Sequence, residues 1–242
     1  MRTQRTPRES KIEAQRSLSD LIMIANLIMM MWRNARVQTE MKLENQKGKS
    51  ITVDVTSPEH SRGYPDEYVS DFVAGKGARF TVRPIRSDDE PLMVDFHRRL
   101  STDTVYRRWF GILKLDARVA HERLLVRCSI DYSNEMALVA EYADAENVRH
   151  IAGVGRFIRN PAGNSAEVAF VVADAHQHHG LGTYLLQQLT EIARREGVAE
   201  LEAEVLSDNF NMRTLFHRAG FSFSQPDGGT VTARKKLLAA SL

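Results

Sequence analysis

The pattern of apolar and polar positions predicts a strand, a loop and a helix in direct succession over residues 166–197. Residues 168–173 are a short apolar run rich in β-branched side chains, which is typical of a buried strand. Apolar residues then recur at helical spacing, with polar residues on the other face. These apolar positions are Leu181, Leu185, Leu189 and Ile192. Gly197 follows the last turn, where a left-handed residue commonly ends a helix.

The same reasoning gives elements on both sides of this segment. Upstream, the pattern predicts a strand at 80–85, helices over 88–100, 102–110 and 116–127, and strands at 136–142 and 151–158. Downstream, it predicts a strand at 201–206, a helix over 209–220, and a closing hairpin of 221–223 with 230–237. Ser87 is a predicted helix cap, and Ser101 or Thr102 is predicted to cap the next helix. Successive strands before the central helix indicate a meander, so the predicted fold class is α/β with a mixed sheet.

The loop of residues 177–182 has the chemistry of an anion site. The first turn of a helix presents backbone N–H groups without partners, and the helix dipole adds partial positive charge. Gly180 and Gly182 carry no Cβ, so a phosphate can approach the backbone. The loop lacks both the Gly-Lys-Ser/Thr ending of a P-loop and the GxGxxG of a dinucleotide fold. The alternative is a strand–helix turn whose glycines serve packing only.

The loop has the form Gln-x-x-Gly-x-Gly, which resembles the pyrophosphate loop of the GNAT superfamily of acetyl-CoA-dependent N-acetyltransferases. Further segments are similar to the GNAT domain of bacterial Pat-type protein lysine acetyltransferases. These are Phe-Thr-Val-Arg-Pro-Ile-Arg at 80–86, Leu-Ser-Thr-Asp-Thr-Val-Tyr-Arg-Arg-Trp-Phe at 100–110, Ala-Glu-Val-Ala-Phe-Val-Val at 166–172 and Ala-Gly-Phe at 219–221. The resemblance covers residues 79–238. It implies the GNAT acyl-CoA N-acyltransferase fold, with a central, mostly antiparallel sheet flanked by helices.

The resemblance also implies acetyl-CoA as co-substrate and assigns residues to its binding. The loop backbone is expected to meet the pyrophosphate, and two residues of the central strand to pair with the pantetheine amides as an added strand would. Asn209 is expected to contact CoA; its alternative role is the cap of the helix that follows. The expected CoA-binding residues are Phe170, Val172, Gln177, His178, His179, Gly180, Leu181, Gly182, Thr183 and Asn209.

Acetyl transfer requires an amine that has lost its proton, and Glu167 is the expected general base. Neutralising a lysine amine of pKa about 10.4 at pH 7 costs roughly 4.6 kcal/mol. A positioned carboxylate can take that proton, directly or through a water. Glu167 lies among small apolar residues, where partial burial would favour its use near neutral pH, and it matches the glutamate of the Pat-type Ala-Glu-x-Ala motif. The alternative is an exposed glutamate at the edge of a strand.

The acceptor and the leaving group are less constrained by the sequence. The leading prediction is transfer to a protein lysine; the alternatives are a small amine, such as a polyamine, amino acid or aminoglycoside, and a non-catalytic acyl-CoA sensor. Many GNAT enzymes protonate the leaving thiolate with a tyrosine that corresponds to Phe216 here. Phe216 has no proton to donate, so the thiolate, with a pKa near about 8.5, is expected to leave unprotonated.

The histidines and the single cysteine do not predict a metal site. His176, His178 and His179 lie in one loop, where successive side chains diverge, and no carboxylate or cysteine pattern completes a ligand set. Cys128 lies among apolar residues and is expected to be a buried, unreactive thiol. One cysteine excludes an internal disulfide framework, which favours a reducing, cytoplasmic setting.

Charge divides the chain into unequal parts. Residues 1–50 hold ten Lys/Arg and five Asp/Glu, whereas the remainder holds 23 and 26. We therefore predict a basic extension at 1–50, an arm or linker at 51–78 with a short strand at 51–55, and the acetyltransferase domain at 79–238. The basic part lacks interleaved aromatic residues and base-reading motifs, so no nucleic-acid partner is expected.

An apolar block occupies residues 21–32 of the basic extension. Its twelve residues are too few to span a bilayer, which needs about 20, so no transmembrane segment is expected. The favoured interpretation of the block is an appended segment without an assigned function; the alternatives are an interfacial helix and a contact between copies in a homo-oligomer. Because a more ordinary sequence begins at Met41, a start site assigned too far upstream is a further hypothesis.

Overall fold

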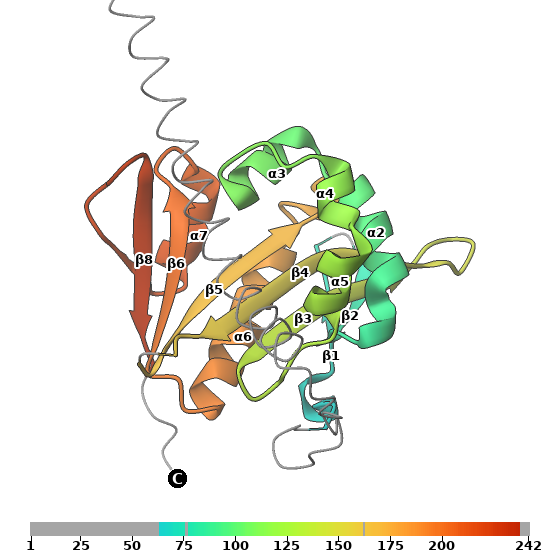
Figure 1. Ribbon diagram of the computed structural model, residues 1–242, viewed down its shortest axis with the longest axis horizontal. Coiled ribbons are helices and arrows are strands. Elements are labelled where there is room, and N and C mark those ends of the chain that lie inside the picture. Colours follow the sequence, from blue (N-terminus) through green and yellow to red (C-terminus); the bar gives the residue numbers. More distant parts are fainter. Residues whose placement is uncertain (1–62, 76, 162, 238–242) are drawn as a thin grey trace, which may run out of the picture. The chain divides into compact units, whose positions relative to one another are not determined.

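The computed structural model describes residues 63–75, 77–161 and 163–237 (Figure 1). The strands are β1 (Ser70–Val73), β2 (Arg79–Pro84), β3 (Glu135–Ala143), β4 (Arg149–Arg159), β5 (Ser165–Val172), β6 (Glu200–Leu206), β7 (Ser222–Phe223) and β8 (Thr230–Lys236). The helices are α2 (Glu90–Arg98), α3 (Thr102–Trp109), α4 (Leu115–Val119), α5 (His121–Cys128), α6 (Leu181–Arg195) and α7 (Phe210–Arg218). Three short 3₁₀ helices are η1 (Asp66–Tyr68), η2 (Ser87–Asp89) and η3 (Asp174–His176).

The strands form one eight-stranded sheet in the order β1-β2-β3-β4-β5-β6-β8-β7. Every neighbouring pair is antiparallel except β5 and β6, which are parallel. A parallel pair needs a crossover connection, and α6 supplies it. The predicted α/β fold class, with a mostly antiparallel sheet flanked by helices, is confirmed.

Alternation along the strands gives the sheet two apolar faces. In β3, Met136, Leu138 and Ala140 belong to the core under α6, whereas Ala137 and Val139 belong to the core under α2 and α5. Figure 1 shows α6 behind the sheet and α2, α4 and α5 in front of it. The sheet is therefore the middle layer of three, and a side chain's position in its strand decides which layer it meets.

The sheet begins earlier than predicted. Strand β1 lies within residues 51–78, the segment predicted to be an arm or linker, and pairs with β2. Its Phe72 stacks on Tyr184 of α6 at 4.6 Å between ring centroids, and this tertiary contact is not visible in a four-residue pattern. A tight turn joins β1 to β2, because the Ala74 N–H donates to the Ala78 carbonyl at 2.8 Å. The predicted strand at 51–55 and the extension at 1–50 lie outside the described residues.

Two local predictions before β3 are wrong in detail. Ser87 does not cap the helix; instead the Asp89 carboxylate accepts the Arg86 N–H at 2.7 Å. The helix predicted over 116–127 is two helices, because Ala120 between them has an extended ψ of 131°. Of the two caps predicted for α3, Ser101 or Thr102, the structure has Ser101, whose hydroxyl accepts the Thr104 N–H at 3.2 Å.

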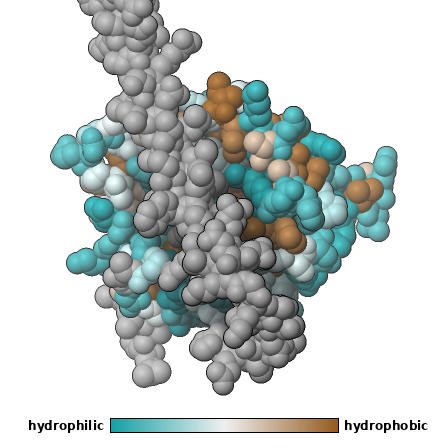
Figure 2. Space-filling model, viewed as in Figure 1, coloured by the Kyte–Doolittle hydropathy of each residue, from teal (hydrophilic) through white to brown (hydrophobic). Residues whose placement is uncertain are grey.

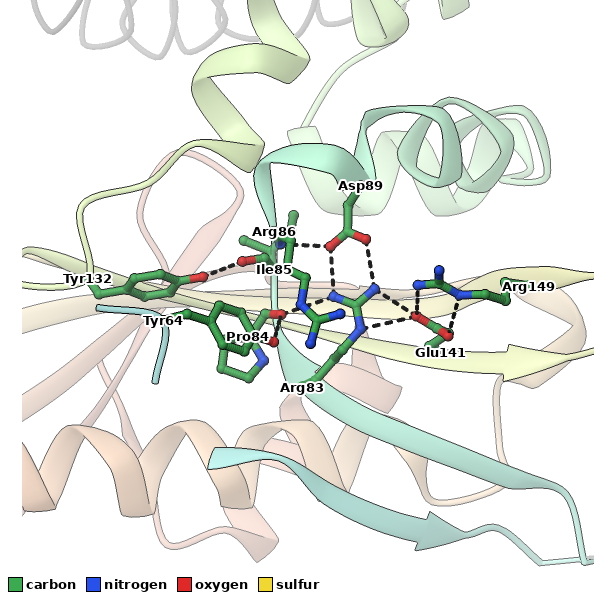
Figure 3. Close-up of polar contacts among 9 residues, drawn as sticks. All are labelled: Tyr64, Arg83, Pro84, Ile85, Arg86, Asp89, Tyr132, Glu141 and Arg149. Carbon is green, nitrogen blue, oxygen red and sulfur yellow. Dashed lines mark hydrogen bonds and ion pairs between the residues drawn. The ribbon is translucent and has the colours of Figure 1, made fainter. Parts of the chain in front are cut away.

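A buried ion network fixes the start of α2 against the sheet (Figure 3). The Arg83 guanidinium is 4% exposed and binds Asp89, which is 2% exposed, with two hydrogen bonds of 2.7 and 2.8 Å. The same guanidinium donates to Glu141 of β3 at 2.7 Å, and Arg149 of β4 donates to Glu141 from the other side. The network therefore joins η2 to three adjacent strands.

We expect Asp89→Ala to lower the free energy of unfolding by about 3 kcal/mol, because it leaves the buried Arg83 with one carboxylate partner instead of two. Urea unfolding followed by circular dichroism measures this. The control is Asp103→Ala, which removes the exposed ion pair with Arg107 and should change stability by less than about 1 kcal/mol. Equal losses in the two variants would contradict the structural role of the network.

The network also predicts how stability depends on pH. Hydrogen bonds from Arg149 and Arg83 outweigh burial and lower the pKa of Glu141 from 4.5 to about 2. Its contribution to stability is therefore present above about pH 4.5 and is lost as the pH falls toward 2. The stability difference between the native protein and Glu141→Gln, measured by urea unfolding, should shrink over that range. A difference that stays constant would contradict the assignment.

Candidate functional site

The site is built around the point where β5 and β6 part. The two strands pair only through Ser165 with Glu200, Ala166 with Leu201, and Glu167 with Glu202. Beyond this point β5 continues to pair with β4, and β6 with β8. Figure 1 shows β5 and β6 spreading from a shared end. One edge of β5 after Glu167 is therefore without a neighbouring strand.

The backbone of Phe170 and Val172 faces this open edge. The Ala173 N–H donates to Ala152 of β4 at 2.8 Å, and successive residues of a strand direct their backbone groups to opposite sides. Residues 170 and 172 therefore turn away from β4. The Val172 carbonyl already accepts a hydrogen bond of 3.0 Å from the Gln177 side chain. The edge has the backbone groups that pairing with an extended ligand requires.

The loop after β5 presents a row of unused donors. Across the described residues, no backbone N–H from His178 to Thr183 donates to a protein acceptor. His178 and Gly180 have positive φ angles of 61° and 90°, and the row ends in the first turn of α6. Consecutive free N–H groups at a helix N-terminus fit a phosphate group. The loop therefore presents the kind of donors that the predicted pyrophosphate loop requires.

The Gln177 side chain connects the loop to α3 and to the end of β5. Its backbone N–H donates to Asp174, so it is not among the free donors, and its side chain donates to Thr104 of α3 and to Val172, both at 3.0 Å. Asp174 in turn accepts from the Ser101 hydroxyl at 2.6 Å and from Thr104 at 2.8 Å. Burial acts to raise the pKa of Asp174, but these hydrogen bonds outweigh it and lower the pKa. Sequence reasoning missed Thr104 and Asp174, because their partners are about 70 residues away in the chain.

Glu167 lies on the face of the sheet opposite α6. Its neighbours Ala166 and Val168 belong to the α6 core, so alternation directs Glu167 toward the side of α3 and α5. The expected partial burial is wrong, because the side chain is exposed. Glu202 lies directly opposite on β6, half-buried and 3.7 Å from Arg234. Sequence reasoning missed this second carboxylate, since only the parallel register brings the two together.

Asn209 and Phe216, at the start and within α7, have structural roles. Asn209 is buried, and its side-chain oxygen accepts the Met212 N–H at 3.2 Å, so it caps α7. Phe216 is buried between Phe170 and Phe221, at 5.7 and 4.8 Å between ring centroids. No ionisable group therefore occupies position 216.

The remaining reactive side chains are separated from one another. His176 lies against Phe80 and Tyr142 at 5.5 and 4.7 Å between ring centroids, while His179 bonds the Gln177 carbonyl. In the described ranges no three His, Cys, Asp or Glu side chains are grouped as metal ligands. Cys128 is buried as predicted, and burial raises the pKa of its thiol to about 11.

In the part of the chain that the structure describes, no helix has both the length and the apolar character needed to cross a membrane.

Comparison with known proteins identifies similar chains. Residues 106–221 match the family model described as the acetyltransferase (GNAT) family. The chain is 30% identical to an acetyltransferase of Pseudomonas aeruginosa over 155 aligned residues. The aligned region covers 64% of this chain and 81% of that protein. It is 32% identical to acetyltransferase Pat of Mycolicibacterium smegmatis over 163 aligned residues. This aligned region covers 64% of this chain and 45% of that protein. The chain thus spans less than half the length of this second relative.

A solved structure agrees with these matches. The GNAT domain of S. lividans PAT superimposes with a TM-score of 0.64 and 28% sequence identity. The superposition covers 72% of this chain and 99% of that domain.

We expect Gly180→Val to weaken CoA binding by about tenfold or more. At φ +90° a β-branched residue is strained by about 1–3 kcal/mol, so the loop must move and its N–H groups lose their alignment. Isothermal titration calorimetry with CoA measures the effect. Gly197→Val is the matched control, because Gly197 has φ +74° at the other end of α6 and open space around it. Equal loss of affinity in both variants would contradict a specific role for the loop.

Proposed function

Because the chain belongs to the acetyltransferase (GNAT) family, we propose that it transfers the acetyl group of acetyl-CoA to a protein lysine, with Glu167 as the general base. The observation that carries this proposal is the position of Glu167. It is the last residue of β5 that pairs with β6, so its carboxylate lies where the open edge begins. A thioester held along that edge would lie beside a proton acceptor.

The binding of acetyl-CoA follows from two sets of backbone groups. The free N–H groups of residues 178–183 hold the pyrophosphate, and each charge-assisted hydrogen bond contributes about 1.5–3 kcal/mol. The open edge of Phe170 and Val172 pairs with the pantetheine amides in the manner of an added strand. The small volume of Gly182 keeps the loop close to this edge, since a Cβ there would lie 3.4 Å from the Phe170 ring.

Glu167 moves the proton in the transfer. Glu167 takes one proton from the lysine ammonium, directly or through a water, and passes it to solvent. The neutral nitrogen then attacks the thioester carbonyl carbon and loses its second proton to the same carboxylate or to water. The C–N bond forms, the C–S bond breaks, and an acetamide and the CoA thiolate are released. Phe216 supplies no proton to the thiolate, which leaves as the anion because its pKa is near about 8.5.

An exposed apolar surface favours a protein as the acceptor over a small amine. Figure 2 shows hydrophobic side chains at the surface among the hydrophilic ones on this side of the molecule. The stretch from α3 to α5 exposes large apolar residues, namely Ile112, Leu115, Leu125 and Val126. Large apolar side chains exposed along one short stretch of the chain support a surface that binds another protein. The resemblance to Pat-type enzymes supports a protein lysine as the acceptor. The single cysteine supports a reducing, cytoplasmic setting.

We expect Glu167→Gln to lower turnover by about 100-fold or more while CoA still binds, because the amide keeps the shape of the side chain but takes no proton. Thiol release from acetyl-CoA with lysine peptides measures turnover, and calorimetry measures CoA binding. The matched control is Glu202→Gln, the carboxylate opposite on β6, which should lower turnover by less than about tenfold.

A larger loss in Glu202→Gln than in Glu167→Gln would move the base to β6 and contradict the assignment. CoA binding without turnover on lysine peptides or small amines would support an acyl-CoA sensor instead.

A further inference from the structure

Four arginines from three elements gather on the same side of the sheet as Glu167. Together they are called the arginine cluster. They are Arg108 at the end of α3, Arg123 and Arg127 on α5, and Arg156 on β4. All four are half-buried. Arg156 lies opposite Ala169 of β5, two residues from Glu167 and therefore on the same face as it.

Carboxylates of the protein neutralise only part of this cluster. Arg156 forms an ion pair with Glu135 at 2.8 Å and donates a hydrogen bond to the Arg127 carbonyl. Within the described ranges, the guanidiniums of Arg108 and Arg127 form no ion pair or hydrogen bond with a side chain. Arginines that are half-buried without a bonded carboxylate are costly to keep, so they indicate an anionic ligand.

The charges of the cluster act on one another and on Glu167. Burial, together with the positive charges of Arg156 and Arg123 and against the negative charge of Glu167, lowers the pKa of Arg108 to about 10. Burial and the neighbouring guanidiniums likewise lower the pKa of Arg127 to about 10. Both remain positive at neutral pH. Glu167 is therefore close enough to the cluster for their charges to interact.

This face of the sheet thus has a negatively charged end and a positively charged end, which are called its acidic and basic poles. Glu167 makes the end at β5 acidic, whereas Glu202 beside it pairs with Arg234 at 3.7 Å; the arginine cluster makes the end at α3 and α5 basic. An acceptor whose amine approaches Glu167 places its neighbouring groups within the field of the guanidiniums. That field opposes polycations such as polyamines and aminoglycosides, and it stabilises a carboxylate beside the amine.

Resting on the proposed function, we infer that the arginine cluster is an anion subsite for the acceptor, which carries a carboxylate close to the reacting amine. In a protein, the carboxylate is an Asp or Glu side chain that flanks the lysine. In a free amino acid, it is the α-carboxylate. The subsite also favours the chemistry, because nearby positive charge lowers the pKa of the amine and so raises the fraction that is unprotonated.

The test compares lysine peptides that differ only in the flanking residues, Glu in one and the isosteric Gln in the other. Their affinities for the full chain saturated with CoA are measured by calorimetry, and turnover is measured with acetyl-CoA. Lysine is compared in the same way with cadaverine, which lacks the carboxylate. The variants are Arg127→Gln and the double variant Arg108→Gln/Arg127→Gln. The single variant is included because Arg108 also lies over the Trp109 ring at 5.4 Å.

The native protein should bind the Glu peptide about tenfold or more tightly than the Gln peptide, and salt should reduce this ratio. The ratio should fall to below about threefold in the double variant. Arg107→Gln is the matched control, because Arg107 is adjacent on α3 but pairs with Asp103 in solvent, and it should keep the native ratio. A preference for lysine over cadaverine, without one between the peptides, supports the subsite with a free amino acid as its source.

The inference is overturned if the native protein discriminates in neither pair, or if the double variant keeps the native ratio. Because binding is measured without turnover, this outcome is separate from failure of the proposed function. A retained preference for the carboxylate with no acetylation of any amine would overturn the proposed reaction and support the anion subsite.

Discussion

The separation of β5 from β6 after three paired residues is the constraint on which the site depends. A parallel pair requires a crossover, and α6 makes it while covering the rear face of the sheet. Phe216 of α7 packs against Phe170 beyond the paired residues. A single strand thus supplies the carboxylate of Glu167, an open backbone edge and the entry to a loop of free N–H groups. Closing the gap by further pairing would remove the edge that an extended ligand requires.

A second constraint joins this strand to the helices in front of the sheet. Asp174 accepts hydrogen bonds from Ser101 and Thr104, and Gln177 reaches both Thr104 and β5. The loop proposed to hold pyrophosphate and the start of α3 are therefore positioned by the same side chains. Since α3 ends at Arg108 and Trp109, the position of the arginine cluster depends on the geometry of the loop. Under the proposed function, co-substrate binding and acceptor selection are linked through these few polar contacts.

On the front face, the negative and positive side chains have different proposed roles. In the proposed reaction Glu167 accepts the proton, and in the inferred subsite Arg108 and Arg127 bind an anion. A lone carboxylate would attract any cationic amine equally. Under that inference, Glu167 and the arginine cluster together select an amine that carries its own negative neighbour, because such an acceptor interacts favourably with both.

Much of the fold was determined by local sequence, because strand alternation and helical spacing are properties of neighbouring residues. The strand, loop and helix of 166–197, the meander before them and the closing hairpin all follow from such patterns. Strand β1 was decided by a tertiary contact that no short window contains, the stacking of Phe72 on Tyr184. The local hydrogen bond of Asp89 with the Arg86 N–H and the break at Ala120 lie within short windows, but the apolar pattern does not distinguish them from a continuous helix. The exposure of Glu167, the approach of Glu202 and the gathering of arginines from α3, α5 and β4 follow from register and from the packing of helices on the sheet. Local periodicity fixes which element a residue joins, and only the folded sheet decides which distant charges face one another.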